Sequence, residues 1–369
     1  MTSKRPTVPS DPFPCEEQGR AFGRPRAFRR FLAAGTVFLL GAGTLACGTD
    51  PKAQGGVRPA ARDTGPVLTY RATGNQVTPA RPSPDPFPGR CDPSLLRLRS
   101  ECACVVDLET GGVLYQKNAG KLSSIASITK LMTAMVVLDA KFPPGEPITI
   151  TADDVDTLRH SRSHLPVGWC LTREQLVQLA LMSSENRAAH AVARAWPGGV
   201  NAFVAAMNDK AGSLGLIHTH FEDPTGLYAG NVSTAADLAR MLTSAYAYER
   251  IREWSTAEGG VFESQTGGRA RTFRNSDRLV HGGKYGIELS KTGYIIEAGY
   301  CLVTVFRVNG RAVACALLNA PRSSHRFSDT VLVRKWLAGE KLTVAAPKAS
   351  KKKAPKTPAK GSKKKTKKK

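Results

Sequence analysis

The sequence lacks several patterns that commonly fix the class of a protein. No cluster of cysteine and histidine residues has the spacing of metal ligands, so the sequence predicts neither a metal site nor a cofactor. The apolar run over residues 31–46 falls short of the roughly 20 residues that a membrane-spanning helix needs. These two absences argue against a metalloprotein and against a spanning helix at that position.

Residues 1–47 have the layout of an export signal. Basic residues between Arg24 and Arg30 precede the apolar run, which ends in small residues, and the chain is polar from Asp50 onward. The segment therefore predicts export to the periplasm or cell envelope. Cys47 suits lipidation, but a leucine stands two places before it instead of the usual three. Lipidation through Cys47, simple cleavage and a retained anchor all stay open.

Three further regions differ in composition. Residues 48–90 are rich in Pro, Gly, Thr and Arg without a sustained period, which predicts a flexible linker. A folded domain is expected over residues 91–345, which is long enough for one substantial core. Residues 346–369 consist mainly of Lys, Ala and Pro, so this tail cannot bury apolar surface and is predicted to be disordered.

The positive charge of the chain is concentrated in that tail. The formal charge is +23, of which the 12 lysines of residues 348–369 contribute +12 with no acid, whereas the predicted domain keeps only +4. Lysine-rich tails bind polyanions by releasing condensed counterions. Behind an export signal, anionic membrane or wall polymers are the expected partners, and no specific nucleic acid is expected. A purely solvating tail is the alternative.

The strand pattern of the domain predicts an α+β fold. Residues 104–107 and 113–115 form a predicted hairpin around a turn at 109–112, and a second hairpin crosses Asn309-Gly310, a pair typical of two-residue turns. Helical patterns occupy the sequence between the two hairpins. This order favours an antiparallel sheet packed against a helical cluster in a single domain.

A serine and a lysine lie one turn apart at the start of the clearest helical pattern. From Ser127 onward apolar residues recur at helical spacing, with no breaker before Pro143, so Ser127 and Lys130 are predicted on one helix face. A serine hydroxyl needs a base to remove its proton, and an amine acts as that base when burial and a second cation keep it neutral. Lys291 is a candidate for that cation. The alternative is a helix cap followed by a surface lysine.

A second polar group lies between two predicted helices. A capping box at Thr172–Gln175 opens a helix that stops at Ser183, and an Ala-rich helix resumes after Asn186. Ser184 and Asn186 are thus predicted on a turn whose side chains can face a cleft. In a catalytic interpretation, Ser184 relays a proton to a leaving amine and Asn186 hydrogen-bonds a substrate amide. In a purely structural interpretation, both residues are helix caps.

The third group belongs to a predicted strand over residues 286–294. Lys291 and Thr292 would hold a substrate carboxylate or carbonyl oxygen, and Gly293 would let the backbone approach a ligand. The amide of Tyr294, together with that of Ser127, could form an oxyanion hole. The alternative is an ordinary edge strand protected by its lysine.

The three groups form the ordered S-x-x-K, S-x-N and K-T-G set of serine enzymes that attack D-alanyl-D-alanine peptides and penicillins. The chain resembles the low-molecular-mass penicillin-binding proteins of peptidase family S11, and within it the D-alanyl-D-alanine endopeptidases, over roughly residues 104–337. The resemblance rests on ASITKLMTAMVVLDA, HSRSHLPVG, LALMSSENRAAHAVA, DPTGL, NVSTAADLARML and LSKTGYIIEAGYCLV.

The resemblance implies a serine β-lactamase/DD-peptidase-like fold with a single catalytic domain. It implies a hydrolase that cuts peptidoglycan cross-links through an acyl-enzyme, with peptidoglycan peptides as substrates and β-lactams as covalent inhibitors. The nucleophile would be Ser127, the base Lys130 and the proton relay Ser184, with Lys291 binding substrate.

Glu185 distinguishes between branches of this resemblance. Carboxypeptidase relatives usually carry Gly between the Ser and the Asn, and many β-lactamases carry Asp, so Ser-Glu-Asn favours the endopeptidases. D-alanyl-D-alanine carboxypeptidase is the first alternative. A β-lactamase is less favoured because no separate E-x-x-x-N lies between the second and third motifs. A non-enzymatic wall-tethering protein would not need the intact serines and lysines.

Six of the eight cysteines follow the signal region and are candidates for disulfides: Cys91, Cys102, Cys104, Cys170, Cys301 and Cys315. If Asn309-Gly310 is a two-residue turn, Cys315 faces Thr304 and lies on the opposite sheet face from Cys301, so those two are not expected to bond. The most local pairing joins Cys91 to Cys102.

Overall fold

The computed structural model describes residues 70–73, 76–79, 86–87, 92–143 and 145–342. The predicted signal region 1–47 and tail 346–369 lie outside these residues. Within the predicted linker, β1 (Tyr70–Thr73) and β2 (Gln76–Pro79) pair antiparallel, in a unit of their own that ends before residue 86. The expectation of an irregular linker missed this hairpin because two four-residue strands are too short to show a period in the sequence.

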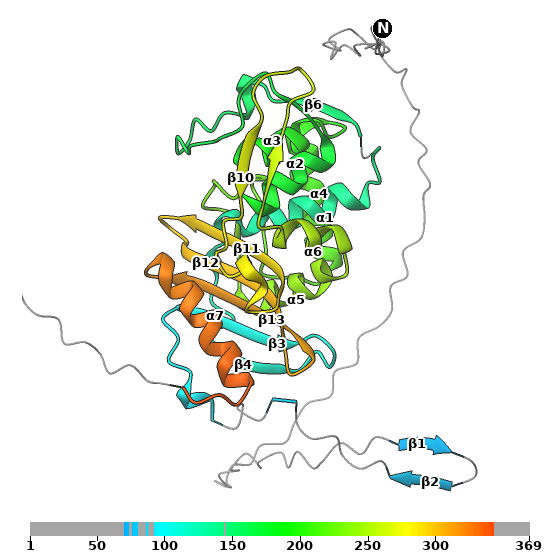
Figure 1. Cartoon of the computed structure of the whole chain (residues 1–369), viewed down its shortest axis with the longest axis vertical. Coiled ribbons are helices and arrows are strands. Elements are labelled where there is room, and N and C mark those ends of the chain that lie inside the picture. The colour runs from blue at the N-terminus through cyan, green and yellow to red at the C-terminus, as the bar shows by residue number, and fades with distance from the viewer. Residues whose placement is uncertain (1–69, 74–75, 80–85, 88–91, 144, 343–369) are drawn as a thin grey trace, which may run out of the picture. The chain divides into compact units, whose positions relative to one another are not determined.

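An antiparallel sheet of five strands forms the centre of the second unit (Figure 1), in the order β11-β12-β13-β3-β4. Both predicted hairpins are confirmed, and the last of these strands in sequence, β13, pairs with the first, β3. The strands are β3 (Cys102–Asp107), β4 (Val113–Lys117), β11 (Ile287–Ile295), β12 (Gly299–Val308) and β13 (Arg311–Ala320). Asn309 and Gly310 both have positive φ, 50° and 79°, as a two-residue hairpin turn requires.

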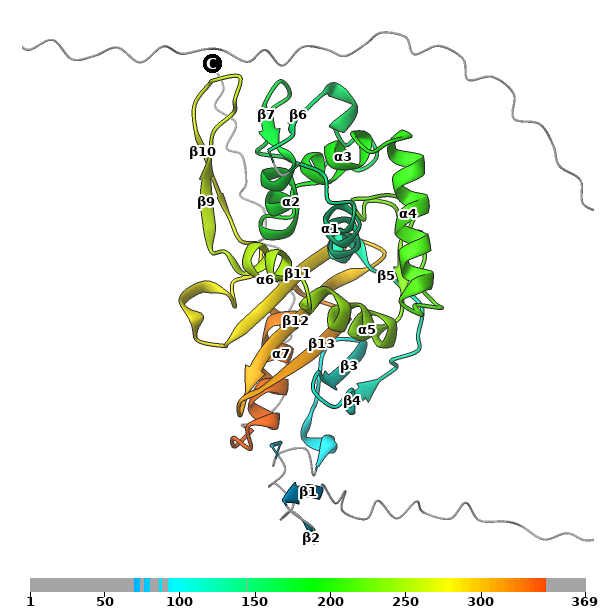
Figure 2. The same cartoon turned by 90° about the vertical axis from the view of Figure 1, so that its right-hand side faces the viewer.

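Helices cover both faces of this sheet, as Figures 1 and 2 show. On one face α7 packs together with the segment before β3, and on the other α5 and α6 lie between the sheet and a cluster formed by the remaining helices. The α+β fold predicted from the sequence is confirmed. The helices are α1 (Lys130–Asp139), α2 (Arg173–Met182), α3 (Asn186–Arg194), α4 (Gly199–Ser213), α5 (Ala235–Tyr246), α6 (Glu249–Thr256) and α7 (Ser323–Leu337).

Short elements connect the sheet and the helices. Among the described residues, no helix is both long and apolar enough to cross a membrane. The paired short strands are β5 (Ser123–Ser124) with β8 (Val232–Ser233), β6 (Pro147–Thr149) with β7 (Cys170–Thr172), and β9 (Gly259–Phe262) with β10 (Arg271–Arg274). The 3-10 turns are η2 (Pro93–Leu95), η3 (Ala126–Thr129), η4 (Ala152–Asp154) and η5 (His281–Gly283).

The alternation of side chains along the strands determines which face of the sheet each strand cysteine occupies. Thr304 pairs with Cys315, as predicted, and Cys301 packs on the helical-cluster face while Cys315 packs on the α7 face. The most local pairing that the sequence allows, Cys91 with Cys102, is not formed, because Cys102 is a free buried thiol. Its side chain enters the helical-cluster core, whereas the segment before β3 packs Leu96 on the α7 face; Cys91 itself lies outside the described residues.

Candidate active site

Ser127 lies on a 3-10 turn, η3, directly before α1. The sequence predicted a helix from Ser127 onward, but residues 126–129 form the 3-10 turn, which opens with a left-handed φ of 48° at Ala126, and the α-helix begins at Lys130. Two glycines enclose this turn. A Cβ on Gly226 would overlap the Ala126 carbonyl, and one on Gly293 would lie 2.9 Å from the Ile125 carbonyl oxygen. Gly293 is therefore required for the close approach of the nucleophile turn to β11. The sequence analysis expected this glycine only to let the backbone approach a ligand.

Lys130 is fully buried directly beneath the serine. Its Nζ lies 2.8 Å from Ser127 Oγ and also donates to Asn186 Oδ1 at 2.7 Å and to the Thr225 carbonyl at 2.6 Å. Burial lowers the pKa of Lys130 to about 7, against the opposing pull of two carboxylates. A lysine with this pKa is neutral in a large fraction of molecules near neutral pH, so it can accept the serine proton.

Lys291 is the second buried lysine of the site. Burial first, and then the charge of Lys130, lower the pKa of Lys291 well below its ordinary value. The sequence reasoning placed this repulsion on Lys130, whereas at Lys130 burial is the cause that lowers the pKa. Nζ of Lys291 donates to Ser184 Oγ at 2.9 Å. The lysine is thus directed into the site and does not protect an exposed strand edge.

The turn between α2 and α3 brings its two predicted residues to different partners. Ser184 has a left-handed φ of 63° and accepts a hydrogen bond from Lys291 of the third motif. Asn186 contacts the first motif, because its Oδ1 accepts a hydrogen bond from Lys130, and its Nδ2 donates to Ser161 Oγ at 2.8 Å. The sequence predicted that Asn186 hydrogen-bonds a substrate amide, and the structure adds one protein contact at each end of its own amide group. In this structure Asn186 positions Lys130.

The rest of the third motif lies along the edge strand β11. Thr292 is nearly buried, and its hydroxyl lies 2.7 Å from that of Ser276, in the segment after β10. Tyr294 leaves half of its side chain exposed and stacks on Tyr300 of β12 with ring centroids 4.3 Å apart. Because Gly293 packs on η3, the amides of Ser127 and Tyr294 belong to adjoining segments, as an oxyanion hole requires.

The loop at 223–226 is the main part of the site that sequence reasoning missed. The Asp223 carboxylate accepts from the amides of Thr225 at 2.8 Å and Gly226 at 3.0 Å, which directs the Thr225 carbonyl at Lys130. Asn231 then ties this loop to η3, because its Nδ2 donates to Thr129 Oγ1 and to the Asp223 carbonyl. An Asp-Pro-Thr-Gly sequence predicts such a turn, but nothing in it predicts contact with Lys130.

Arg326 of α7 is a further missed residue. Its Nη1 donates to the carbonyls of Gly293 at 2.8 Å and Cys301 at 3.0 Å, and it is 8% exposed. It holds the end of β11 against β12 from the α7 face. No local pattern around Arg326 signals this role, because its partners lie more than 20 residues away in the sequence.

Glu185 has a structural role beside the motif residues. Its buried carboxylate accepts from Ser163 Oγ at 2.6 Å and from the amide of His164 at 3.0 Å. The loop that contains Ser161, and hence the support of Asn186, is thereby fixed against the turn between α2 and α3.

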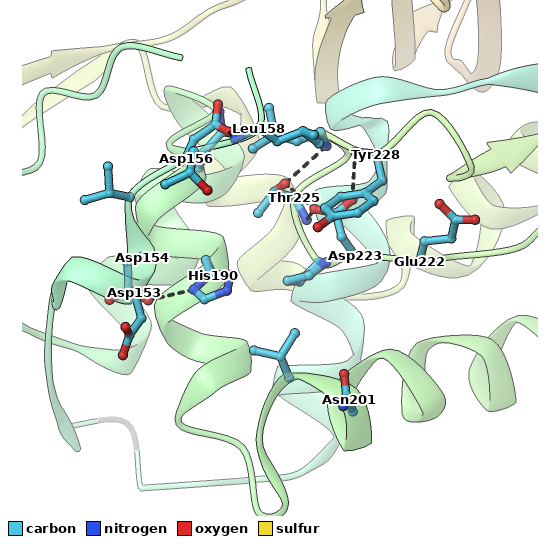
Figure 3. A pocket seen from close by; sticks show the side chains of 16 residues that line it. Asp153, Asp154, Asp156, Leu158, His190, Asn201, Glu222, Asp223, Thr225 and Tyr228 are labelled. Atoms are coloured by element: carbon cyan, nitrogen blue, oxygen red, sulfur yellow. Dashed lines mark hydrogen bonds and ion pairs between the residues drawn. The ribbon is translucent and has the colours of Figure 1, made fainter. Parts of the chain in front are cut away.

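A pocket of about 280 Å³ adjoins the site at Asn186 and Thr225 (Figure 3). Two of its carboxylates are engaged by the protein: Asp154 holds His190 at 2.8 Å as well as Arg194, and Asp223 holds the turn described above. Within the described ranges, no three His, Cys, Asp or Glu side chains are grouped so as to hold a metal ion.

Comparisons with known proteins agree with this geometry. A model of peptidase family S11, described as D-alanyl-D-alanine carboxypeptidase, matches residues 90–322. A D-alanyl-D-alanine endopeptidase of Pseudomonas aeruginosa is 42% identical over 275 residues, which are 74% of this chain and 88% of that protein. The protein of the same name from Escherichia coli is 38% identical over 245 residues, 66% of this chain and 79% of that protein.

Solved structures give the same answer for the fold. The Streptomyces K15 DD-transpeptidase aligns with a TM-score of 0.62 at 29% identity, covering 66% of this chain and 98% of that chain. Penicillin-binding protein D2 from Listeria monocytogenes, in its ampicillin-bound form, aligns with a TM-score of 0.56 at 27% identity, covering 65% and 98%. The chain belongs to peptidase family S11, as its motifs predict, and has the fold of the DD-peptidases.

Proposed function

We propose that this protein is a serine D,D-endopeptidase that hydrolyses D-alanyl cross-links in peptidoglycan and is acylated by β-lactams. The observation that carries the proposal is the 2.8 Å contact between Lys130 Nζ and Ser127 Oγ, made by a lysine whose pKa is about 7. The names of the Pseudomonas and Escherichia relatives support endopeptidase activity over carboxypeptidase activity. The Ser127–Lys130 pair suits endopeptidase and carboxypeptidase reactions alike. The choice of endopeptidase activity therefore rests on the similarity to these relatives.

Acylation begins when Ser127 Oγ attacks the carbonyl carbon of the scissile bond and its proton passes to Lys130 Nζ. The amides of Ser127 and Tyr294 stabilise the negative charge that develops on the carbonyl oxygen. As the carbon–nitrogen bond breaks, the leaving amine takes a proton from Ser184, which Lys291 contacts at 2.9 Å. The proton that Lys130 accepted from Ser127 replaces the one that Ser184 gives up, so Lys130 is neutral again. The product is an ester on Ser127 and a free amine.

Deacylation uses the same groups with water as the nucleophile. Lys130 accepts a proton from the water as its oxygen attacks the ester, and it passes that proton to Ser127 Oγ when the ester bond breaks. A β-lactam follows the first half of this sequence, but its leaving amine stays tethered to the acyl group when the ring opens. The adduct therefore persists for as long as water fails to attack it.

Defined muropeptides distinguish the proposal from its main alternative. We expect the purified protein to cleave a cross-linked dimer between the two peptide stems faster than it removes the terminal D-alanine of a pentapeptide monomer. Liquid chromatography with mass spectrometry of the products measures both rates. Faster release of free D-alanine would identify the protein as a carboxypeptidase, and rapid turnover of penicillin would revive the β-lactamase alternative.

We further propose export to the cell envelope, directed by residues 1–47 with Cys47 as a candidate lipid anchor, and electrostatic retention by the lysine-rich tail. Truncation after Ala346 removes the +12 segment but leaves a domain of +4. We expect the truncated protein to hydrolyse soluble muropeptides at an unchanged rate, yet to bind anionic vesicles or sacculi with a much flatter dependence on salt. Co-sedimentation over a salt series measures this. Equal salt slopes for both proteins would mean that the tail only solvates the chain.

A further inference from the structure

A pocket of about 390 Å³ lies between the β9–β10 hairpin and the loop at 162–169. Its volume falls within the range of pockets that bind small molecules. The residues that line it are His164, Arg269, Ala270, Arg271 and Thr272.

Strand alternation places Arg271 on this pocket, and Arg269 lines it from the connection directly before β10. In β10, Phe273 turns inward and meets the ring of His164 edge-on, with centroids 6.5 Å apart. Arg271, two residues earlier, shares that face, and its guanidinium lies 5.8 Å from the centre of the Trp169 ring. The hairpin is also tied to β7, because the amide of Cys170 donates to Ser264 Oγ at 2.9 Å. The two walls of the pocket are therefore held by packing and hydrogen bonds.

The charge in this pocket is positive and is not neutralised by the protein. Among the described residues, Arg269 has no hydrogen-bonding or acidic partner, and Arg271 contacts only the Trp169 ring. Many other arginines of the domain are paired, as Arg307 is with Glu288. The hairpin has one acid, Glu263, which is exposed and forms no ion pair with either arginine. Two guanidinium groups that line one pocket without an acidic partner suit a carboxylate, which a guanidinium can bind through paired N–H donors.

The pocket is linked directly to the catalytic residues. Its residue His164 donates its amide to Glu185, which stands between Ser184 and Asn186. Ser161, directly before this loop, accepts from Asn186. The loop that lines the pocket is therefore bound to the turn between α2 and α3, which carries Ser184 and Asn186 of the active site.

We infer that the pocket at His164, Arg269 and Arg271 binds a free carboxylate of a peptide stem next to the scissile bond. This inference rests on the proposed function, because it takes the occupant to be part of the peptidoglycan substrate. The pocket would select stems with free carboxylates over stems in which these groups are amidated. The pocket strengthens substrate binding and takes no part in bond making or breaking.

The test removes the two charges while keeping polar side chains. We expect the double variant Arg269→Gln/Arg271→Gln to lose about tenfold in kcat/KM on a cross-linked dimer with free stem carboxylates, mainly through a higher KM, because each lost guanidinium removes charge-assisted hydrogen bonds. On the same dimer with amidated carboxylates, the variant and the parent should differ by less than about twofold. Acylation by a β-lactam should be unchanged.

A matched variant controls for the loss of two positive charges. Arg97 and Arg99 are also exposed and unpaired, but they flank Leu98, which packs on the α7 face of the sheet. Arg97→Gln/Arg99→Gln should therefore retain full activity on both dimers. Equal losses on free and amidated dimers, or no loss from the Arg269/Arg271 variant, would overturn the inference.

A binding measurement separates this inference from the proposed function. If the parent protein fails to cut any cross-linked dimer, the proposed function is wrong, but calorimetric titration of Ser127→Ala with either dimer still reports on the pocket. Weaker binding of only the free-carboxylate dimer, when the two arginines are replaced in that background, would support the pocket. Unchanged binding of both dimers would refute it.

Discussion

The variant Ser127→Ala should form no covalent adduct with a β-lactam and should hydrolyse no cross-linked peptide. Ser127 Oγ is the hydroxyl that Lys130 contacts at 2.8 Å, and its turn is held between the 223–226 loop and β11. Without that oxygen there is no atom to form the ester, so the expected loss is complete and does not depend on a change of affinity.

Intact-protein mass spectrometry after incubation with penicillin measures this result. The parent protein should gain the mass of one drug molecule, and the variant Ser213→Ala, which removes an exposed hydroxyl from α4, should gain the same mass. An adduct on the Ser127→Ala variant would identify a different nucleophile and remove the basis of the proposed mechanism.

The variant Lys130→Arg should lower the rate of acylation by about a hundredfold or more, which is the usual contribution of a general base. A guanidinium keeps the positive charge and can still donate hydrogen bonds, but it does not become neutral near pH 7. The surface variant Lys335→Arg provides the matched control, because Lys335 lies partly exposed near the end of α7. Stopped-flow acylation by a chromogenic β-lactam measures all three rates.

The dependence on pH gives a second measurement on the same residue. Burial lowers the pKa of Lys130 to about 7, so its neutral form increases as the pH rises through 7. Acylation by the parent protein should therefore rise over this range and level off above it. The Lys130→Arg variant should show no such rise, provided circular dichroism shows that it is folded. A near-normal rate in this variant would assign the base to another group.

The nucleophile and its base could be predicted from the sequence because their relation is local. Ser127 and Lys130 are three residues apart, so any helical turn brings them together, whether of 3-10 or α geometry. The two hairpins were predicted for the same reason, since alternation and the Asn309-Gly310 turn lie within a few residues of each other.

The remaining contacts of the site depend on tertiary structure, which no local pattern encodes. Thr225 supplies a carbonyl to Lys130 from 95 residues away, and Arg326 reaches Gly293 from another helix. The contact between Asn186 and Lys130 could not be predicted because it depends on the turn at Ser184. The left-handed φ at that residue sends the serine toward Lys291 and the asparagine toward Lys130.

The two glycines that enclose the nucleophile turn also limit how this protein can evolve under drug selection. Any side chain at Gly226 or Gly293 must displace the backbone at Ile125 or Ala126, and with it the oxygen of Ser127. A displaced oxygen is equally misplaced for a peptide and for a penicillin. Substitutions at these two glycines therefore cannot reduce acylation by penicillin while preserving hydrolysis of the peptide. Selection must instead alter residues that contact only one of the two ligands.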